Sequence, residues 1–476
     1  MSPSAPASLS AAPASPSRHW MWLAAWPVVA VLALSNEPAP LYVLWQDDIG
    51  FSSATVTAVY AFYIAGLLAT VTVAGTLSDR FGRKPVLLPG LALALLASVL
   101  FAVAHSVPAL AVARLLSGVA VGAFLSAGMA AVSDLSDSTQ KRTAGLVASS
   151  AMVGGAAVGP LLAGLLSELV PGPSVTVFLV QIALLALALP VVLRMPLPHR
   201  ATAPATAPAT DGTVTGRRLI RIPSAPRANR RQLLLCLAVF APAIAATGFV
   251  LSLGPTLLAD LLHTSSRILS GSTIFILFAA ATGVQFAARR LRTRTDLLSG
   301  AALTVSSMVA LALAVATTSV TALVASAVLA GLGQGLTQLG ALTMLSANVP
   351  ARRLAEANAA LTAGGYVLAG ALPLAAGALS DATSLTTGTA VFSATVAALS
   401  LAGAVTVRAG IEDKAVGPSP SRAGTAPVTS RARTALAVAA AATARPPQDR
   451  RPPAPSASAR PDTPAAGRRA AARSTE

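Results

Sequence analysis

Charged residues are scarce in this chain. Asp, Glu, Lys and Arg together make up 11% of its 476 residues, whereas 54% are hydrophobic. Soluble globular domains carry about 25% charged residues, so this composition excludes an ordinary water-soluble protein. Apolar runs of about 20 residues recur along most of the sequence, and each is long enough to cross a bilayer as a helix. We therefore expect a membrane protein that is surrounded by lipid.

Residues that support catalysis or metal binding are also few. The single cysteine, Cys236, lies inside an apolar run, so no disulfide can form within the chain. The four histidines are scattered without the spacing of metal ligands. None of the lysines follows the glycines of a phosphate-binding loop. We expect no enzymatic activity, no metal and no cofactor, and any process that needs energy would then draw on an ion gradient, for which the proton is our candidate.

Acidic residues are outnumbered by basic ones, 17 against 34, which gives a net charge of +17. The cations gather in loops and tails rather than on one folded face, so we do not expect nucleic-acid binding. Counted from the N-terminus, the second, fourth and other even-numbered apolar runs are each followed by cations, for example Lys141 and Arg142, or Arg352 and Arg353. Basic loops stay on the cytoplasmic side of a membrane. This pattern predicts a multi-pass inner-membrane protein with both termini in the cytoplasm.

We predict an all-α membrane protein with about twelve transmembrane helices. Residues 195–231 are rich in Pro, Ala and Thr and then basic, as in a flexible cytoplasmic linker. They separate two pseudo-symmetric six-helix bundles, 20–194 and 232–408. Residues 1–19 and the basic segment 409–476 have no periodic apolar face, and we predict that both are disordered in the cytoplasm. The predicted spans are 20–41, 54–77, 86–104, 108–132, 144–167, 174–194, 233–259, 268–288, 298–316, 319–345, 356–379 and 386–408.

The loop after the second span has an ordered pattern of charges and glycines. Glycine takes φ > 0 at little cost, so the chain can reverse sharply at Gly82. Asp79 can cap a helix or pair with Arg83, four residues on. A basic loop after any membrane hairpin accounts for the cations alone, but not for the whole pattern. Its candidate residues are Gly75, Asp79, Arg80, Gly82, Arg83 and Lys84.

Small residues recur along the fifth predicted span. Gly155, Gly159 and Ala163 are spaced four apart, so one face of this helix has no bulk and another helix can approach it closely. Pro160 removes the backbone hydrogen bond to the carbonyl of Ala156 and should bend the helix there. A packing face of small residues explains this pattern as well as a functional role does.

Three stretches resemble signatures of the major facilitator superfamily. The loop from Gly75 to Pro85 resembles the G-x-L-x-D-R-x-G-R-K loop, and Arg114–Gly122 is similar to R-x-x-x-G-x-x-x-G. The run Gly155–Gly164, with Gly159 and Pro160, is similar to G-x-x-x-G-P-x-x-G-G, with alanine replacing one glycine. The resemblance covers roughly residues 20 to 408. It implies two six-helix halves around a central cavity, and the third motif implies export by antiport, as in drug:proton antiporters.

The resemblance also implies a role for the charged loop as a conformational latch. Asp79 would meet the inner end of the eleventh span when the transporter opens outward. Arg83 would reach Asp134, at the inner end of the fourth span. A solvated loop acid is the alternative for Asp134.

Two charges lie inside predicted spans and away from their end residues, and a charge at the centre of a span costs about 2.5–3.5 kcal/mol on insertion scales. At 1.5 Å per residue, Glu37 lies about 25 Å along the first span and Arg114 about 9 Å below the outer surface on the fourth. These depths nearly match in a core about 30 Å thick, and the family resemblance places both spans beside the cavity. We therefore predict a Glu37–Arg114 pair that loads and releases the coupling proton. The alternative is a solvated Glu37 at the outer interface, because Pro38 and Pro40 indicate that the helix ends there.

Uncharged polar residues within spans are candidates for the substrate cavity. Gln334 and Gln338 lie one turn apart, so both can face the same side of their helix. For any one candidate, a hydrogen bond between helices is an equally good explanation. The candidates are Asn36, Tyr60, Tyr63, Gln334, Gln338 and Tyr366, and Gln181 and Gln285 could join them.

These features predict a secondary transporter that exports small, partly apolar, drug-like compounds in exchange for protons by alternating access, working as a monomer. Proton-linked uptake of a small metabolite or sugar is the alternative within the same fold. A membrane scaffold or sensor that acts through the basic tail is an alternative of a different class.

Overall fold

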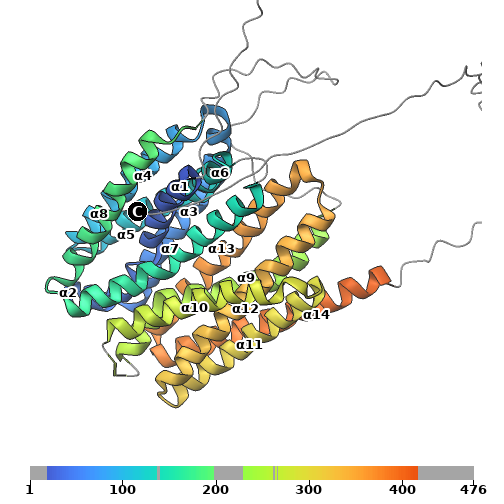
Figure 1. Ribbon diagram of the computed structural model, residues 1–476. Coiled ribbons are helices and arrows are strands. Elements are labelled where there is room, and N and C mark those ends of the chain that lie inside the picture. Colours follow the sequence, from blue (N-terminus) through green and yellow to red (C-terminus); the bar gives the residue numbers. More distant parts are fainter. Residues whose placement is uncertain (1–18, 137–139, 198–228, 261–262, 265, 416–476) are drawn as a thin grey trace, which may run out of the picture. The chain divides into compact units, whose positions relative to one another are not determined.

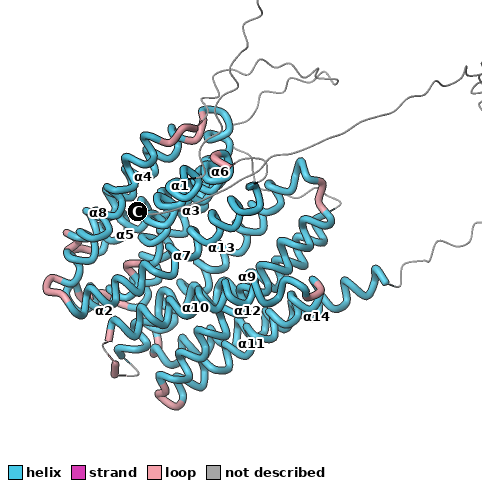
Figure 2. The backbone as a smooth tube through the Cα atoms, viewed as in Figure 1, coloured by secondary structure: helices cyan, strands magenta, loops and turns pink. Residues whose placement is uncertain are grey.

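The computed structural model describes residues 19–136, 140–197, 229–260, 263–264 and 266–415. These residues form helices and connecting turns, and no strand occurs among them (Figure 2). Twelve helical spans in this part of the chain are long and apolar enough to cross a membrane. The predicted all-α fold with twelve transmembrane helices is confirmed. The segments predicted to be disordered, and most of the predicted linker, lie almost entirely outside the described residues.

Figure 1 shows the helices of both halves. The first half comprises α1 (His19–Asn36), η1 (Ala39–Leu41), α2 (Tyr42–Ile49), α3 (Ser53–Phe81), α4 (Lys84–Ala102), α5 (Val107–Ala123), the π-helical η2 (Phe124–Gly128), α6 (Met129–Asp134), α7 (Lys141–Leu169) and α8 (Pro173–Arg194). The second half comprises α9 (Arg230–Asp260), α10 (Arg267–Ala287), η5 (Ala288–Arg290), α11 (Thr293–Ala316), α12 (Val320–Asn348), α13 (Ala351–Ala382) and α14 (Leu385–Ala415).

The first span differs from the prediction, which had one helix over 20–41. Helix α1 ends at Asn36, a short 3₁₀ turn follows, and α2 continues to Ile49. Pro38 and Pro40 cause the break, because each lacks an N–H and clashes with the carbonyl four residues before it. At the other end of the chain, α14 continues to Ala415, so residues predicted to begin a disordered tail at 409 are helical.

The fourth span is also interrupted, which the sequence did not predict. Five residues between α5 and α6 are π-helical. Phe124, at the start of this segment, is fully buried and packs against Gly90 of α4 and Gly128. A π-helical turn widens the helix and re-aims the side chains that follow it.

Two helix pairs form the most extensive contacts between the halves: α7 packs on α10, and α3 packs on α13. Both crossings depend on glycine. A Cβ atom on Gly164 of α7 would clash with the backbone carbonyl of Arg267, and one on Gly271 of α10 would clash with that of Pro160. Likewise, a Cβ atom on Gly377 of α13 would clash with the side chain of Thr57 on α3. The helix axes approach at these points because no side chain intervenes.

Candidate functional site

A cavity lies between the two halves and encloses about 840 Å³ of empty space, open solvent included. Both halves line it: α1, α3, α5, η2 and α7 from one, and α9, α10, α12 and α13 from the other. Apolar side chains, such as Leu32, Met152, Ile244 and Phe278, form part of the wall. The polar lining residues are Ser35, Asn36, Tyr60, Tyr63, Thr247, Thr282, Gln285, Gln334, Gln338 and Tyr366.

All six residues predicted for the substrate cavity lie in this lining. Their contact with a substrate stays a prediction. Gln334 accepts a hydrogen bond from the Thr247 hydroxyl at 2.6 Å, which joins two helices of the second half across the cavity wall. Gln181 lies elsewhere, fully buried, and donates to the carbonyl of Ala30.

Arg114 is the buried cation behind this cavity. Its side chain is 1% exposed and lies among aromatic rings, with its guanidinium carbon 5.2 Å from the ring centre of Tyr42, 6.0 Å from Tyr60 and 5.6 Å from Tyr63. It donates to the Tyr42 hydroxyl and to the carbonyl of Ser35, each at 2.7 Å. The broken first span supplies that carbonyl, because α1 ends one residue later. The negative end of α1 and the ring faces therefore stabilise the positive charge.

The predicted ion pair between Glu37 and Arg114 is not formed in this conformation. Arg114 uses its donors on Ser35 and Tyr42, and no hydrogen bond or ion pair joins it to Glu37 among the described residues. Glu37 is 3% exposed, and its Oε2 atom has no hydrogen-bond partner. The alternative of a solvated Glu37 is wrong as well. Both residues are buried, but the depth argument could not foresee that a carbonyl freed by the broken helix would attract the guanidinium.

Asn36 connects the cavity to the proline of the fifth span. Pro160 has no N–H to donate to the carbonyl of Ala156, and Asn36 supplies the missing hydrogen bond through Nδ2 at 3.2 Å. Next to this contact, α7 crosses α1 closely, since a Cβ atom on Gly155 would lie 2.5 Å from the carbonyl oxygen of Val29. Of the helix-5 motif, Gly155 and Gly159 face α1, whereas Gly164 and Pro160 face α10 of the other half.

The halves are bonded to each other at the end that holds the loops after the odd-numbered spans. At the end of α7, Glu168 accepts hydrogen bonds from the Ser266 hydroxyl at 3.1 Å and from the N–H of Ile268 at 2.8 Å, which caps α10. At the end of α13, Asp381 accepts from the N–H of Ala54 at 3.2 Å, which caps α3. Each half thus places a carboxylate on a helix N-terminus of the other, where it is electrostatically favoured. We call these two contacts the reciprocal caps.

The same helices have free space nearer their other ends. A Cβ atom added at Gly75 on α3, at Gly145 on α7 or at Gly283 on α10 would meet no atom within 4 Å. The close crossings and the reciprocal caps all lie toward one end, so the halves are held together there, and these glycines nearer the basic loops make no such contact.

The charged loop after the second span forms a network within the first half. Arg83 donates to Asp79 Oδ1 and to Asp134 Oδ2, each at 2.9 Å, and to the Ser78 hydroxyl at 2.7 Å. Partial burial lowers the pKa of Arg83, but the hydrogen bonds and charges of Asp134 and Asp79 raise it, with a net rise. The predicted contact with Asp134 is present, and the alternative of an unpaired loop acid is excluded. Gly82 has φ of 95°, as the sharp reversal requires.

Other predicted members of the latch lie around this network. Lys84 donates to the carbonyl of Leu193 at the end of α8, at 2.7 Å. Arg80 is exposed and lies over the Phe81 ring. The side chain of Asp79 is 69% exposed and pairs with Arg83 of its own half. Its predicted contact with the eleventh span belongs to the opposite conformation and stays a prediction.

Asp79→Asn should slow transport several-fold and leave the substrate dissociation constant of the present conformation unchanged. An exposed ion pair contributes about 0–1 kcal/mol, so the loss of the Asp79–Arg83 pair changes the stability of the present conformation little. In the outward-open conformation, the same substitution would remove the predicted contact of Asp79 with the eleventh span. Initial transport rates and equilibrium binding of the same compound separate the two effects. Unchanged rates would rule out the latch.

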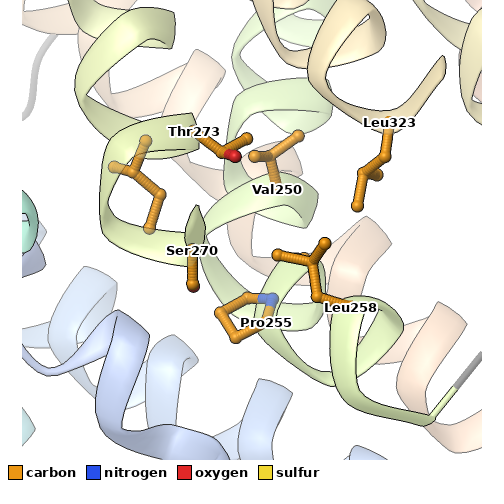
Figure 3. A pocket seen from close by; sticks show the side chains of 8 residues that line it. Val250, Pro255, Leu258, Ser270, Thr273 and Leu323 are labelled. Atoms are coloured by element: carbon orange, nitrogen blue, oxygen red, sulfur yellow. The ribbon is translucent and has the colours of Figure 1, made fainter. Parts of the chain in front are cut away.

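A smaller pocket of about 220 Å³ lies in the second half, between α9, α10 and α12 (Figure 3). Its lining is mostly apolar, and Ser270 and Thr273 are its only hydroxyl groups. Among the described residues, no group of three or more His, Cys, Asp or Glu side chains comes together as a metal site would require. The central cavity is therefore the candidate site.

Twelve spans in two halves around a cavity, with the hydrogen bonds between the halves at one end of the described residues, are the architecture of a membrane transporter. The family model of the Major Facilitator Superfamily matches residues 21–314, and the chain belongs to that family. It is a transporter and not an enzyme.

The sequence is similar over a short stretch to multidrug resistance proteins. MdtL of Klebsiella pneumoniae is 30% identical over 95 residues, which are 20% of this chain and 24% of that protein. MdtL of Escherichia coli K12 is 33% identical over 94 residues, with the same shares. The aligned stretch thus spans about a quarter of the length of these relatives.

Solved transporter structures share the fold over most of the chain. A bacterial homolog of the human lysosomal transporter Spinster, inward-facing and occupied, has a TM-score of 0.66 at 13% identity and covers 83% of this chain and 97% of that one. The nucleoside transporter NupG, solved as a point mutant, has a TM-score of 0.63 at 13% identity, and the match covers 81% of this chain and 99% of that one.

Proposed function

We propose that this transporter exports small, partly apolar organic compounds across the cell membrane in exchange for protons. The single observation that carries the proposal is the position of Glu37. It is the residue after the cavity-lining Asn36, and it is buried with a carboxyl oxygen that no other group pairs. An unpaired carboxylate costs several kcal/mol in such a place, and binding a proton removes that cost.

The cavity supports the class of cargo. Its wall mixes aliphatic, aromatic, amide and hydroxyl groups, which suits drug-sized molecules with a few hydrogen-bonding groups. The partial similarity to MdtL of two bacteria is consistent with multidrug export. The chain itself supplies no nucleotide-binding loop, so a proton gradient is the proposed energy source, and one chain holds the whole cavity.

The basic loops support an orientation in which both termini are cytoplasmic. The cavity closed by the reciprocal caps would then be open toward the cytoplasm, as an exporter requires when it collects its cargo. Reopening to the outside would need the reciprocal caps to break.

Removing both reciprocal caps, by Glu168→Ala with Asp381→Ala, should therefore raise the ratio of outward-open to closed protein by at least about fivefold. Each lost cap costs the closed state about 0.5–2 kcal/mol, and the two sites are far enough apart to add. Spin labels at His105 and Thr317, in a Cys236→Ser background, report the distance between the halves at this end.

Asp48→Ala is the matched control for this pair, because Asp48 is an exposed acid at the same end that makes neither contact. It should leave the label distances unchanged. If the double variant gives the same distances as the control, the reciprocal caps do not hold the end closed.

Cells with and without the protein test the proposed function itself. Expression should lower the steady-state content of small aromatic compounds such as a neutral fluorescent amide, and collapsing the proton gradient should abolish the difference. A higher content in expressing cells would favour uptake and overturn the export direction.

A further inference from the structure

We infer that the cavity selects uncharged compounds and rejects cations. This inference rests on the proposed function, because it names the class of cargo for the same cavity. It follows from three observations: the lining is neutral, the cation of Arg114 stands behind it, and two of the four aromatic residues of the wall, Tyr60 and Tyr63, already lie against that cation.

The lining itself carries no charge. Among the described residues that line the cavity, the polar groups are amides and hydroxyls, and none is a carboxylate or an ammonium. A cation that enters exchanges its water for these dipoles without meeting an opposite charge, which is costly. An anion likewise finds no cationic donor in the lining.

While Glu37 holds a proton, Arg114 biases the cavity further against cations. Its guanidinium does not reach the lining, but Tyr60 and Tyr63, which lie on it, do. A cation stacked on the cavity side of these rings would be about 10 Å from the guanidinium, and like charges at that distance and an effective dielectric constant of about 20 weaken binding by more than about tenfold.

The tyrosine rings offer less compensation than free rings would. Cation–π attraction arises from the ring quadrupole, and the guanidinium of Arg114 already draws on Tyr42, Tyr60 and Tyr63. The lining suits planar, neutral molecules. Its aromatic rings offer surface for stacking, and the amides of Gln334 and Gln338 offer both hydrogen-bond donors and acceptors.

Three benzanilides of nearly equal shape test this inference, with a para tert-butyl, trimethylammonium or carboxylate group. Their binding to the purified full-length protein is measured by calorimetry in detergent, which requires no proton gradient. We expect the tert-butyl compound to bind at least about tenfold more tightly than the trimethylammonium compound, and more tightly than the carboxylate, which exchanges its water for the neutral lining.

Gln334→Glu and Gln338→Glu should each raise the affinity for the trimethylammonium compound by at least about tenfold relative to the tert-butyl compound. Glutamate has nearly the shape of glutamine, and at position 334 it can still accept the hydrogen bond from Thr247. Gln140→Glu, outside the cavity at the start of α7, is the matched control and should leave the selectivity unchanged.

Each outcome decides between distinct conclusions. A wild-type protein that binds the trimethylammonium compound as tightly as the tert-butyl compound overturns the rejection of cations, one that binds the carboxylate as tightly overturns the preference for uncharged compounds, and both results leave export standing. Unchanged selectivity in both glutamate variants also overturns it. If none of the three compounds binds, the proposed cargo class is wrong and the inference falls with it.

Discussion

Glu37→Gln should abolish proton-driven accumulation while leaving substrate binding intact. Gln has the size of Glu but binds no exchangeable proton, and the buried Oε2 atom has no partner that the change would disrupt. A gradient of about two pH units stores about 2.7 kcal/mol per proton, enough for an accumulation of about 100-fold at one-to-one exchange. In vesicles, we expect the variant to reach a ratio of about one between the substrate concentrations on the two sides of the membrane. Its dissociation constant for the substrate should stay within about threefold of the wild-type value.

Substrate counterflow is the matched readout for this variant. Exchange of labelled for unlabelled substrate needs the conformational cycle but no gradient, so it should survive in Glu37→Gln. Glu356→Gln, on α13 at the basic end and half-buried beside Arg353, is the control substitution and should keep full coupling. Normal accumulation by Glu37→Gln would remove Glu37 from the proton path.

Gly159→Ala should disrupt transport and destabilise the fold, although it adds a single methyl group. The new Cβ atom would clash with the carbonyl oxygen of Ala33 and lie 2.8 Å from its carbonyl carbon, and backbone atoms cannot rotate away. Helix α1 would have to shift, and with it Ser35 and Asn36 of the cavity wall. We expect overpacking to cost about 1–3 kcal/mol and substrate affinity to fall at least about tenfold.

Gly154→Ala is the matched control on the same helix, because its Cβ atom would meet nothing within 4 Å. Alanine is favoured over glycine within helices by about 1 kcal/mol, so this variant should be neutral or slightly more stable. The two substitutions therefore act in opposite directions on the thermal unfolding temperature. Equal effects would show that the crossing of α1 and α7 is not tightly packed.

Much of the fold could be predicted because membrane insertion leaves a strong signature in sequence. Length and apolarity located twelve spans, and the loop network of Arg83 with Asp79 and Asp134 followed from charge pattern and family resemblance. The six polar residues predicted for the cavity share it because they point from several helices toward one axis, which the family architecture implied.

The details that sequence patterns missed depend on which backbone groups lose their partners. The break after Asn36 frees the carbonyl of Ser35, and this carbonyl takes the hydrogen bond of Arg114 that was assigned to Glu37. The prolines at positions 38 and 40 were the available signal. The reciprocal caps of Glu168 and Asp381 join helix ends that are far apart in sequence, and no periodicity or motif indicates such pairs.

Proton movement in vesicles tests the central claim most directly. Purified protein is reconstituted with a pH-sensitive dye inside, and an outward gradient of the neutral tert-butyl benzanilide is imposed. The account predicts that protons enter as the compound leaves, that an inside-negative potential accelerates this exchange because the cargo is uncharged, and that Glu37→Gln shows no proton movement. Protons that leave together with the compound, or that enter equally fast in Glu37→Gln, would contradict it.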